Sequence, residues 1–282
     1  MSLDRTAPLQ IFVAVKGHAF DRNAFEAMIR GLGGMEPTMV DQPAAAMLFN
    51  PEAMRRFDAI LFYDMPGLDF RAPKAKRPAA VPPEKDFVQG FEALMAEGKG
   101  MVALHHALAG WPGWPAYGEA LGGTFLYKDR EVRGEERPSS GYAGDIVYEA
   151  VRSEIDHPVL AGVPASFELN DELYLHDVFE SDVVPLLRLR QRPPPERFIS
   201  AMRAVRRLAP DEGEPWLPPA GSDVIAWAKA AGNSPLVYFQ PGDGTQTYAD
   251  PCYRLLLGNA LRWVASEAGR DWARARGGLA KG

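Results

Sequence analysis

Two adjacent histidines, His105 and His106, follow the short apolar run GMVAL and precede a stretch rich in Trp, Pro and Gly. An imidazole can transfer protons near neutral pH, and it can also bind a transition metal through a ring nitrogen. The chain has 5 histidines in 282 residues, so two of them at the end of one predicted strand favour a chemical role. We expect His105 to lie nearer the tip of the turn and His106 to point inward.

Other polar side chains also follow predicted strands. His18 comes after the run LQIFVAV, Asp64 ends the run FDAILFYD, and Asp243 lies in the motif PGDG after the run PLVYFQ. The carboxyl ends of parallel strands meet at one edge of a sheet, where α/β proteins bind their ligands. We therefore expect these residues to meet His105 and His106 at that edge. The alternative is that each strand-end histidine caps a helix or bonds a carbonyl.

The segment NDELYLHDV carries a second polar group of residues. On a strand, Glu172, Tyr174 and His176 share one face, while Leu173 and Leu175 share the other. If the leucines face the core, the carboxylate, phenol and imidazole line a cleft. The alternative is the solvated face of an edge strand.

Aromatic residues lie just after the histidine pair. Trp111 and Trp114 belong to the segment GWPGW, and an indole ring can stack on the face of a sugar ring. We therefore consider both as substrate-binding residues. The alternative is that they pack at the start of the following helix.

Imidazoles and carboxylates at one edge of a sheet are also the usual ligands of zinc. If a divalent metal such as zinc is bound, its candidate ligands are His18, His105, His106, Glu172 and His176. No histidine pair has the i, i+4 spacing of a helical zinc motif. The residues leave both a metal-dependent and a metal-free site open.

The elements that must position these residues follow an α/β pattern. The apolar runs 9–15, 58–63, 101–104 and 236–239 predict buried parallel strands, because strands alternate with helical segments. Between residues 145 and 190 several strand-like runs occur without long helices between them. We therefore predict a doubly wound, mostly parallel sheet with an antiparallel excursion in the middle of the chain.

Three further segments complete this organisation. The Pro-rich loop 65–83 leaves a strand at the ligand-binding edge, and its length suits a lid. Residues 1–266 are predicted to form a single domain. Residues 267–282 are charged and rich in glycine, so we expect a frayed tail.

Composition excludes several classes of protein. The chain has 31 basic and 37 acidic residues, and this net charge of −6 argues against nucleic-acid binding. No apolar run approaches the ~20 residues of a membrane span. One cysteine permits no intrachain disulfide, and the first apolar run is too short for a signal peptide. We expect a cytoplasmic protein with a small-molecule ligand; a homo-oligomer remains open.

Five separated motifs resemble those of a known family. They are VAVKGHAFDRNAFEAM, FDAILFYDMPG, GKGMVALHHALAGWPGWPAYGEALGGTF, DHPVLAGVPASFELNDELY and VYFQPGDGTQTYADPCYRLLLGNALRWVA. Together they are similar to the trehalose-utilisation (ThuA-like) family, in the same order, from about Leu9 to Ala265. The resemblance implies the class I glutamine-amidotransferase-like superfamily and its flavodoxin-like three-layer fold.

The sequence departs from the amidotransferases of this superfamily at the histidine turn, and from the pattern of its relatives at Asp243. Those enzymes carry a nucleophilic cysteine on the turn that holds His105 and His106 here, whereas Cys252 falls in a predicted helix. Glutamine hydrolysis through a thioester is therefore not expected. Relatives often have GHG where this chain has Asp243 between two glycines, so a triad-like role for that position is in doubt.

The resemblance implies an enzyme of sugar or polyol metabolism that acts on a trehalose-type sugar or a keto-sugar. His105 or His106 would act as general acid or base, and Glu172 would orient the imidazole or share its proton. The substrate-binding candidates are His18, Asp64, Trp111, Trp114, Tyr174, His176 and Asp243. The alternative is a carbohydrate-binding protein without catalysis that has lost amidotransferase chemistry.

Overall fold

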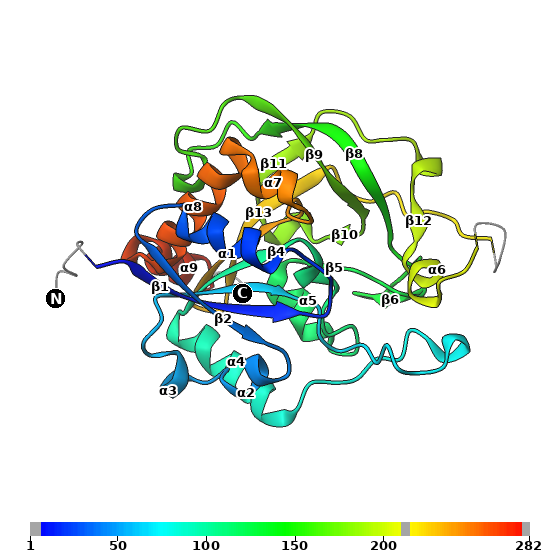
Figure 1. The fold of residues 1–282 in the computed structure, drawn as a ribbon, viewed down its shortest axis with the longest axis horizontal. Coiled ribbons are helices and arrows are strands. Elements are labelled where there is room, and N and C mark those ends of the chain that lie inside the picture. The colour runs from blue at the N-terminus through cyan, green and yellow to red at the C-terminus, as the bar shows by residue number, and fades with distance from the viewer. Residues whose placement is uncertain (1–6, 210–214, 278–282) are drawn as a thin grey trace.

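A mixed β-sheet organises the molecule (Figure 1). The computed structural model describes residues 7–209 and 215–277 of the chain. These residues form a 10-stranded sheet with the order β12-β8-β11-β13-β14-β4-β3-β1-β2, in which β9 pairs with β8. Its strands are β1 (Leu9–Lys16), β2 (Met35–Asp41), β3 (Ala59–Asp64), β4 (Gly100–Leu104), β8 (Gly141–Arg152), β9 (Ser166–Leu175), β11 (Val184–Leu189), β12 (Ile199–Ser200), β13 (Val224–Ala231) and β14 (Ser234–Phe239).

One half of this sheet is parallel. Strands β2, β1, β3, β4 and β14 pair in parallel with their neighbours. Along β1, Ile11 and Val13 belong to one hydrophobic cluster, while Phe12 and Ala14 belong to another. Both faces of the strand are therefore buried, as its continuous apolar run predicts. The predicted parallel core is confirmed.

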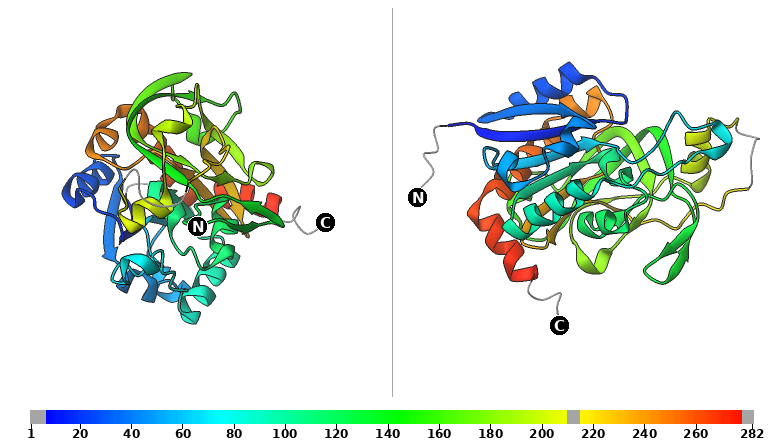
Figure 2. Two further views of the ribbon diagram at one scale, coloured as in Figure 1. Left: turned by 90° about the vertical axis from the view of Figure 1, so that its right-hand side faces the viewer. Right: turned by 90° about the horizontal axis from the view of Figure 1, so that it is seen from below.

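Helices cover the two faces of the parallel strands (Figure 2). Apolar side chains of α1 and α8 pack in the cluster on one face, and those of α4 and α5 pack in the cluster on the other. This arrangement confirms the three-layer, flavodoxin-like α/β fold. The helices are α1 (Arg22–Arg30), α2 (Ala44–Met47), α3 (Pro51–Met54), α4 (Lys85–Glu97), α5 (Pro115–Leu121), α6 (Ala201–Arg206), α7 (Thr245–Ala249), α8 (Pro251–Ala265) and α9 (Glu267–Gly277).

The other half of the sheet is antiparallel. Strand β13 pairs antiparallel with β14 and β11, and β8 does so with β11, β9 and β12. The predicted antiparallel excursion is therefore confirmed. Two small sheets lie outside it: one pairs β5 (Gly123–Thr124) with β10 (Asp177–Val178), the other β6 (Arg130–Val132) with β7 (Glu135–Arg137). The long ribbon of β8 and β9 carries the second predicted polar group.

The C-terminal segment differs from its prediction. Residues 267–277 were expected to fray, but they form α9, which packs against β13 and β14. The Trp272 ring lies 5.1 Å from that of Trp263, and Ala273 is fully buried. This apolar face outweighs the charged residues that suggested a frayed end. Residues 278–282 of the predicted tail lie outside the described residues. Within the described ranges, no helix is both long and apolar enough to cross a membrane.

Candidate active site

The turn after β4 places the histidine pair. His105 begins the short 3-10 helix His105–Ala109 with a φ of 49°, a left-handed conformation that costs free energy in any residue other than glycine. This turn aims the two imidazoles in different directions, at an interplanar angle of 86°. His105 is 0% exposed and His106 is 1% exposed. Both rings are therefore buried: Tyr174 of β9 and the Gln240 carbonyl contact His105, and the Tyr63 carbonyl contacts His106.

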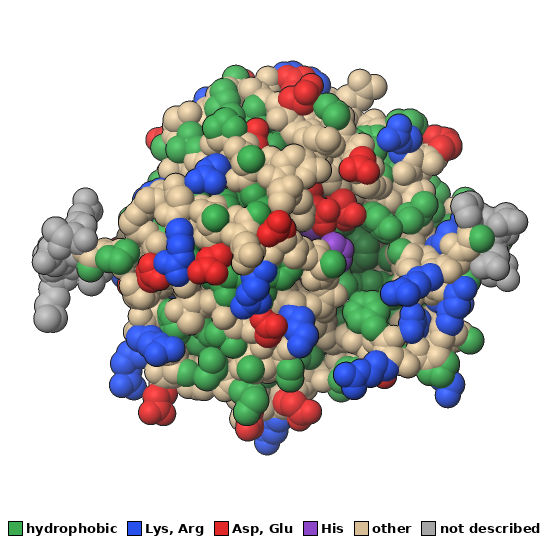
Figure 3. Space-filling model, viewed as in Figure 1, with side chains coloured by type: hydrophobic (Ala, Val, Ile, Leu, Met, Phe, Trp, Pro, Cys, Tyr) green, Lys and Arg blue, Asp and Glu red, His purple; other side chains and the backbone are tan. Residues whose placement is uncertain are grey.

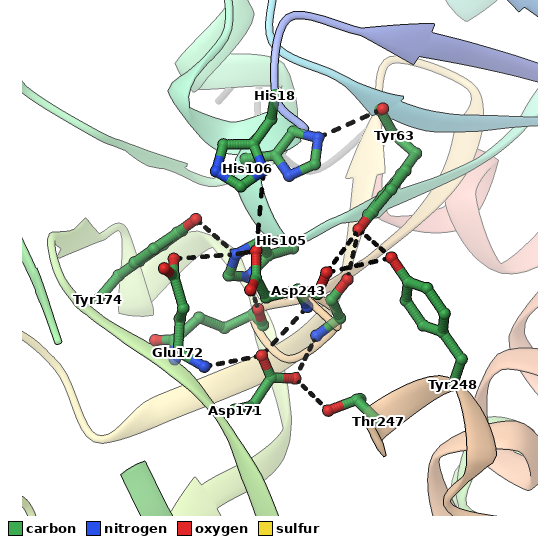
Figure 4. Close-up of polar contacts among 12 residues, drawn as sticks. His18, Tyr63, His105, His106, Asp171, Glu172, Tyr174, Asp243, Thr247 and Tyr248 are labelled. Carbon is green, nitrogen blue, oxygen red and sulfur yellow. Dashed lines mark hydrogen bonds and ion pairs between the residues drawn. The ribbon is translucent and has the colours of Figure 1, made fainter. Parts of the chain in front are cut away.

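The His105 ring is held at both nitrogens (Figure 4). Nδ1 lies 2.7 Å from the Gln240 carbonyl oxygen, which can only accept, so Nδ1 donates. Nε2 lies 2.7 Å from the Tyr174 hydroxyl, 3.3 Å from a Glu172 oxygen and 3.4 Å from an Asp243 oxygen. Burial opposes protonation, but the Asp243 and Glu172 carboxylates outweigh it and raise the pKa of His105 to about 10.

These three residues also form a group that could hold a metal ion. Ligand atoms of His105, Glu172 and Asp243 all lie within 4.8 Å of one another. This differs from the predicted ligand set, because Asp243 takes part and His176 does not. His18 is adjacent, with its Nδ1 3.7 Å from the same Asp243 oxygen.

His106 has a different environment. Its Nε2 lies 3.3 Å from the Tyr63 carbonyl oxygen, and its ring centroid is 4.7 Å from that of His18. Within the described ranges its Nδ1 has no hydrogen-bond partner. Burial, together with the nearby His105 and His18, holds the pKa of His106 well below its usual range. His106 is therefore a neutral imidazole that donates to a carbonyl through Nε2 and keeps a free lone pair on Nδ1.

A pocket of about 210 Å³ opens at this edge of the sheet. Figure 3 shows histidine and acidic side chains at the border of a hollow with hydrophobic walls. His18, His106, Glu172 and Tyr174 line the pocket, whereas His105 lies behind that lining. Its other walls are Met65, Phe70, Ala109, Phe125, Tyr127, Tyr142, Ala201, Ala204 and Val205. The structure thus brings two predicted histidines together with the polar face of β9.

The loop 65–83 forms one side of the pocket. Met65 and Phe70 belong both to this loop and to the pocket lining, and Phe70 is 42% exposed. The prediction that this loop lies beside the histidines is confirmed. Its action as a lid stays a prediction.

A buried carboxylate that sequence reasoning did not select organises the site. Asp171 precedes Glu172 on β9 and accepts hydrogen bonds from the backbone N–H groups of Gly242 (2.7 Å) and Asp243 (3.1 Å). It also accepts from the Thr247 hydroxyl (2.6 Å) and from the Glu172 N–H (2.7 Å). Asp171 therefore fixes the loop that presents Asp243 to the strand that presents Glu172. The adjacent acidic pair in NDELY is the signal that could have identified it.

Five predicted substrate-binding residues lie outside the pocket lining: Asp64, Trp111, Trp114, His176 and Asp243. Asp64 is buried and accepts a hydrogen bond from the Gln42 side chain at 2.6 Å; burial raises its pKa to about 6. It points to the opposite face of β3 from Tyr63, as strand alternation requires. Trp111 and Trp114 pack on Phe87, with centroid distances of 5.0 and 5.9 Å. Both rings thus pack against α4 just before the start of α5, in line with the alternative considered for them.

His176 is also placed outside the pocket. Strand β9 ends at Leu175, so the alternation that groups His176 with Glu172 stops one residue too early. The His176 ring instead stacks on Trp227, with a centroid distance of 6.2 Å. Burial lowers its pKa to about 4.

This low pKa predicts a measurable pH dependence of stability. The unfolded chain binds a proton at His176 near the ordinary value of about 6.5. The stabilisation that neutral His176 provides is therefore complete above about pH 6.5 and is lost as pH falls toward 4, by up to about 3 kcal/mol. Urea unfolding of wild type and His176→Gln at pH 7 and pH 4.5 should show a smaller acid-induced loss in the variant. Equal losses would refute this pKa.

The single cysteine is remote from the turn. Cys252 lies in the first turn of α8, as predicted, with a partly exposed side chain whose pKa is raised by burial. A raised pKa disfavours the reactive thiolate. Cys252→Ser is therefore expected to change the free energy of unfolding by at most about 1 kcal/mol and to leave ligand binding intact. Loss of activity in a folded variant would show that the thiol is the nucleophile.

Several pocket residues carried no sequence signal. Phe125 and Tyr127 come from the irregular segment that follows β5, and Tyr142 lies at the start of β8, opposite Tyr174 of β9. Ala204 and Val205 belong to α6, which follows a Pro-rich loop. Tertiary structure alone brings these residues to the histidines.

Comparison with known proteins places the chain in a family. The family model described as trehalose utilisation, ThuA, matches residues 11–264. The chain belongs to the ThuA family. No curated protein matches the sequence significantly.

Solved structures support the fold of this ThuA chain. A ThuA-like protein of Bacteroides uniformis is similar with a TM-score of 0.59 and 20% identity, over 93% of this chain and 94% of that one. A ThuA-like protein of Parabacteroides merdae gives a TM-score of 0.63 and 12% identity, over 92% and 90%. A cytoplasmic protein of Salmonella typhimurium LT2 gives 0.52 and 12%, over 91% and 99%. At these identities the similarity concerns the fold.

Proposed function

We propose that this ThuA protein is an enzyme that transfers a proton to or from a small polyhydroxylated substrate, a sugar, polyol or keto-sugar. One observation carries the proposal. The Glu172 carboxylate and the His106 imidazole line the same pocket of about 210 Å³ at the carboxyl ends of the parallel strands. Groups that exchange protons are rarely brought together in a cavity with aromatic walls unless a ligand uses them.

The walls of the pocket indicate the kind of substrate. Tyr127, Tyr142, Tyr174 and Phe125 supply aromatic surface, on which the C–H face of a sugar ring can pack. The volume suits one ring-sized molecule and is smaller than the roughly 300 Å³ at which pockets for drug-sized ligands begin. The polar groups at one end can bind hydroxyl or keto oxygens. The family description, trehalose utilisation, agrees with a sugar-like substrate.

The hydrogen bonds support separate roles for the polar side chains that line the pocket. The free lone pair on His106 Nδ1 accepts a proton from a substrate hydroxyl or from a carbon next to a keto group. Glu172 binds a neighbouring hydroxyl, and His105 holds this carboxylate from behind at 3.3 Å. His18 borders the same cavity and completes its polar end. As part of this proposal the enzyme works in the cytoplasm, a compartment that suits a chain with one cysteine.

A substrate panel with a matched pair of variants tests the proposal. Wild type is incubated with hexoses, polyols, trehalose and their 3-keto derivatives, and both binding and product are measured. We expect one class to be converted, His106→Gln to lose turnover by about 100-fold or more, and His176→Gln to keep it. The control removes another buried imidazole that lies outside the pocket.

The same panel decides between this proposal and a carbohydrate-binding protein. Saturable binding of one sugar without any product would support the non-catalytic alternative. Full turnover in His106→Gln would remove the proposed role of this imidazole. If no member of the panel binds, the substrate class is wrong.

A further inference from the structure

Two of the three distances among His105, Glu172 and Asp243 match those between neighbouring ligand atoms of a metal ion, and the three ligand atoms all lie within 4.8 Å of one another. His105 Nε2 lies 3.3 Å from a Glu172 oxygen and 3.4 Å from an Asp243 oxygen. Zinc binds histidine nitrogen and carboxylate oxygen at about 2.0–2.2 Å, so ligand atoms in a tetrahedral site lie about 3.3–3.6 Å apart. These two contacts therefore have the length of tetrahedral edges. We propose that His105, Glu172 and Asp243 bind one divalent transition-metal ion.

The His105 ring is prepared for this role by its second hydrogen bond. Nδ1 donates to the Gln240 carbonyl oxygen at 2.7 Å, which directs Nε2 at the two carboxylates. Metal-binding histidines commonly donate their other N–H to a carbonyl or carboxylate in this way, because the bond fixes the tautomer and the ring orientation. The Tyr174 hydroxyl, 2.7 Å from Nε2, is the group that competes with the ion for this nitrogen.

The backbone segments that carry the two carboxylates are also held in place. Asp171 accepts hydrogen bonds from the backbone N–H groups of Gly242, Asp243 and Glu172. The two ligand-bearing segments are thus tied to one buried anion. A site prearranged in this way pays little ordering entropy when it binds an ion.

Buried nitrogen and oxygen atoms near His105, Glu172 and Asp243 lack hydrogen-bond partners, as lone pairs that bind a metal ion would. Among the described residues, His106 Nδ1 is buried with no hydrogen-bond partner. His18 Nδ1 and Asp243 Oδ1 are also buried without a hydrogen bond; they lie 3.7 Å from each other, and Asp243 Oδ1 lies 3.4 Å from His105 Nε2. His106, 1% exposed, lines the pocket that Glu172 also lines. Buried polar atoms without partners are rare in native proteins, and an ion with its bound water is one explanation for them. Because Glu172 lines the pocket, an ion bound to it would lie at the pocket border, where a substrate oxygen can reach it as at catalytic zinc sites.

The donor set selects the kind of ion. One imidazole and two carboxylates suit zinc or manganese, and His18 is the nearest additional imidazole, 3.7 Å from Asp243. Magnesium and calcium prefer sites made of oxygen alone. The inference is independent of the proposed substrate, because the ion can be measured without any sugar.

Titration of the full-length protein with Zn²⁺ tests this site directly. The chelator-treated protein is titrated by calorimetry, and the bound metal is counted by elemental analysis after dialysis. We expect one equivalent per chain, weaker binding of Mn²⁺, and no stoichiometric binding of Mg²⁺. Asp243→Asn and His105→Ala should each weaken Zn²⁺ binding by at least about 100-fold. The exposed control Asp145→Asn should bind as wild type does.

Two variants make the outcome of the Zn²⁺ titration clear even if one variant fails to fold. Tyr174→Phe removes the competing hydroxyl and should bind Zn²⁺ at least as tightly as wild type. Asp243 is partly exposed, so its conservative substitution reports on the ion even if His105→Ala fails to fold. Absence of stoichiometric Zn²⁺ and Mn²⁺ would overturn the inference, and so would binding that Asp243→Asn leaves unchanged. If the chelator-treated protein still converts the sugar, the ion is not needed for catalysis, and the proposed substrate class is unaffected.

Discussion

Glu172→Gln is expected to lower turnover of the sugar-like substrate by about 100- to 10,000-fold while the protein stays folded. Glutamine has the same shape as glutamate but carries no charge, so it cannot share a proton or stabilise a cation at this position. The Glu172 side chain is 18% exposed and lines the pocket, so little core packing depends on it. The measurement is kcat and KM on the substrate that the panel identifies, with a thermal melt of the same preparation.

The control is the same substitution on the same strand. Glu168 lies on β9, four residues before Glu172, and its side chain is exposed outside the pocket. Glu168→Gln should leave both turnover and melting temperature unchanged. Equal activity in wild type and Glu172→Gln would remove the carboxylate from the mechanism. A loss of activity accompanied by early melting would instead make Glu172 a structural residue.

The parallel core could be predicted from sequence because its physical cause is local. Ile11 and Phe12 are both buried, on opposite faces of β1, and a short continuous run of β-branched and aromatic residues favours a strand covered on both sides. The carboxyl ends of these strands then fix where His18, His105 and His106 meet. This topological argument, and not the identity of any single residue, predicted the position of the site.

The rest of the site depends on contacts that periodicity does not encode. His176 was grouped with Glu172 on the assumption that the strand continues, but the strand ends at Leu175. Trp111 and Trp114 are close to the histidines in sequence, yet their rings pack on Phe87. The aromatic pocket walls come from segments distant in the chain. No local sequence pattern predicts which of these segments come together in the fold.

The second large effect is expected at Asp171. Asp171→Ala should lower the free energy of unfolding by about 3–5 kcal/mol, because it removes the acceptor for four donors. Asp171 is 4% exposed, so water cannot replace those hydrogen bonds without opening the structure. The loss is measured by urea unfolding at pH 7, with Glu168→Ala on the same strand as the control, which should stay within about 0.5 kcal/mol.

The same variant should lose the site as well as stability. Gly242 and Asp243 are held to β9 by the Asp171 carboxylate, so without it Asp243 is no longer fixed beside His105. Asp171→Asn separates the two effects: its amide keeps the volume and one acceptor oxygen but turns an N–H group toward the backbone donors. We expect it to fold better than Asp171→Ala and still to lose most of the turnover. If Asp171→Asn keeps wild-type stability and turnover, the buried carboxylate does not organise this site, and Asp243 must be positioned by the β14–α7 loop alone.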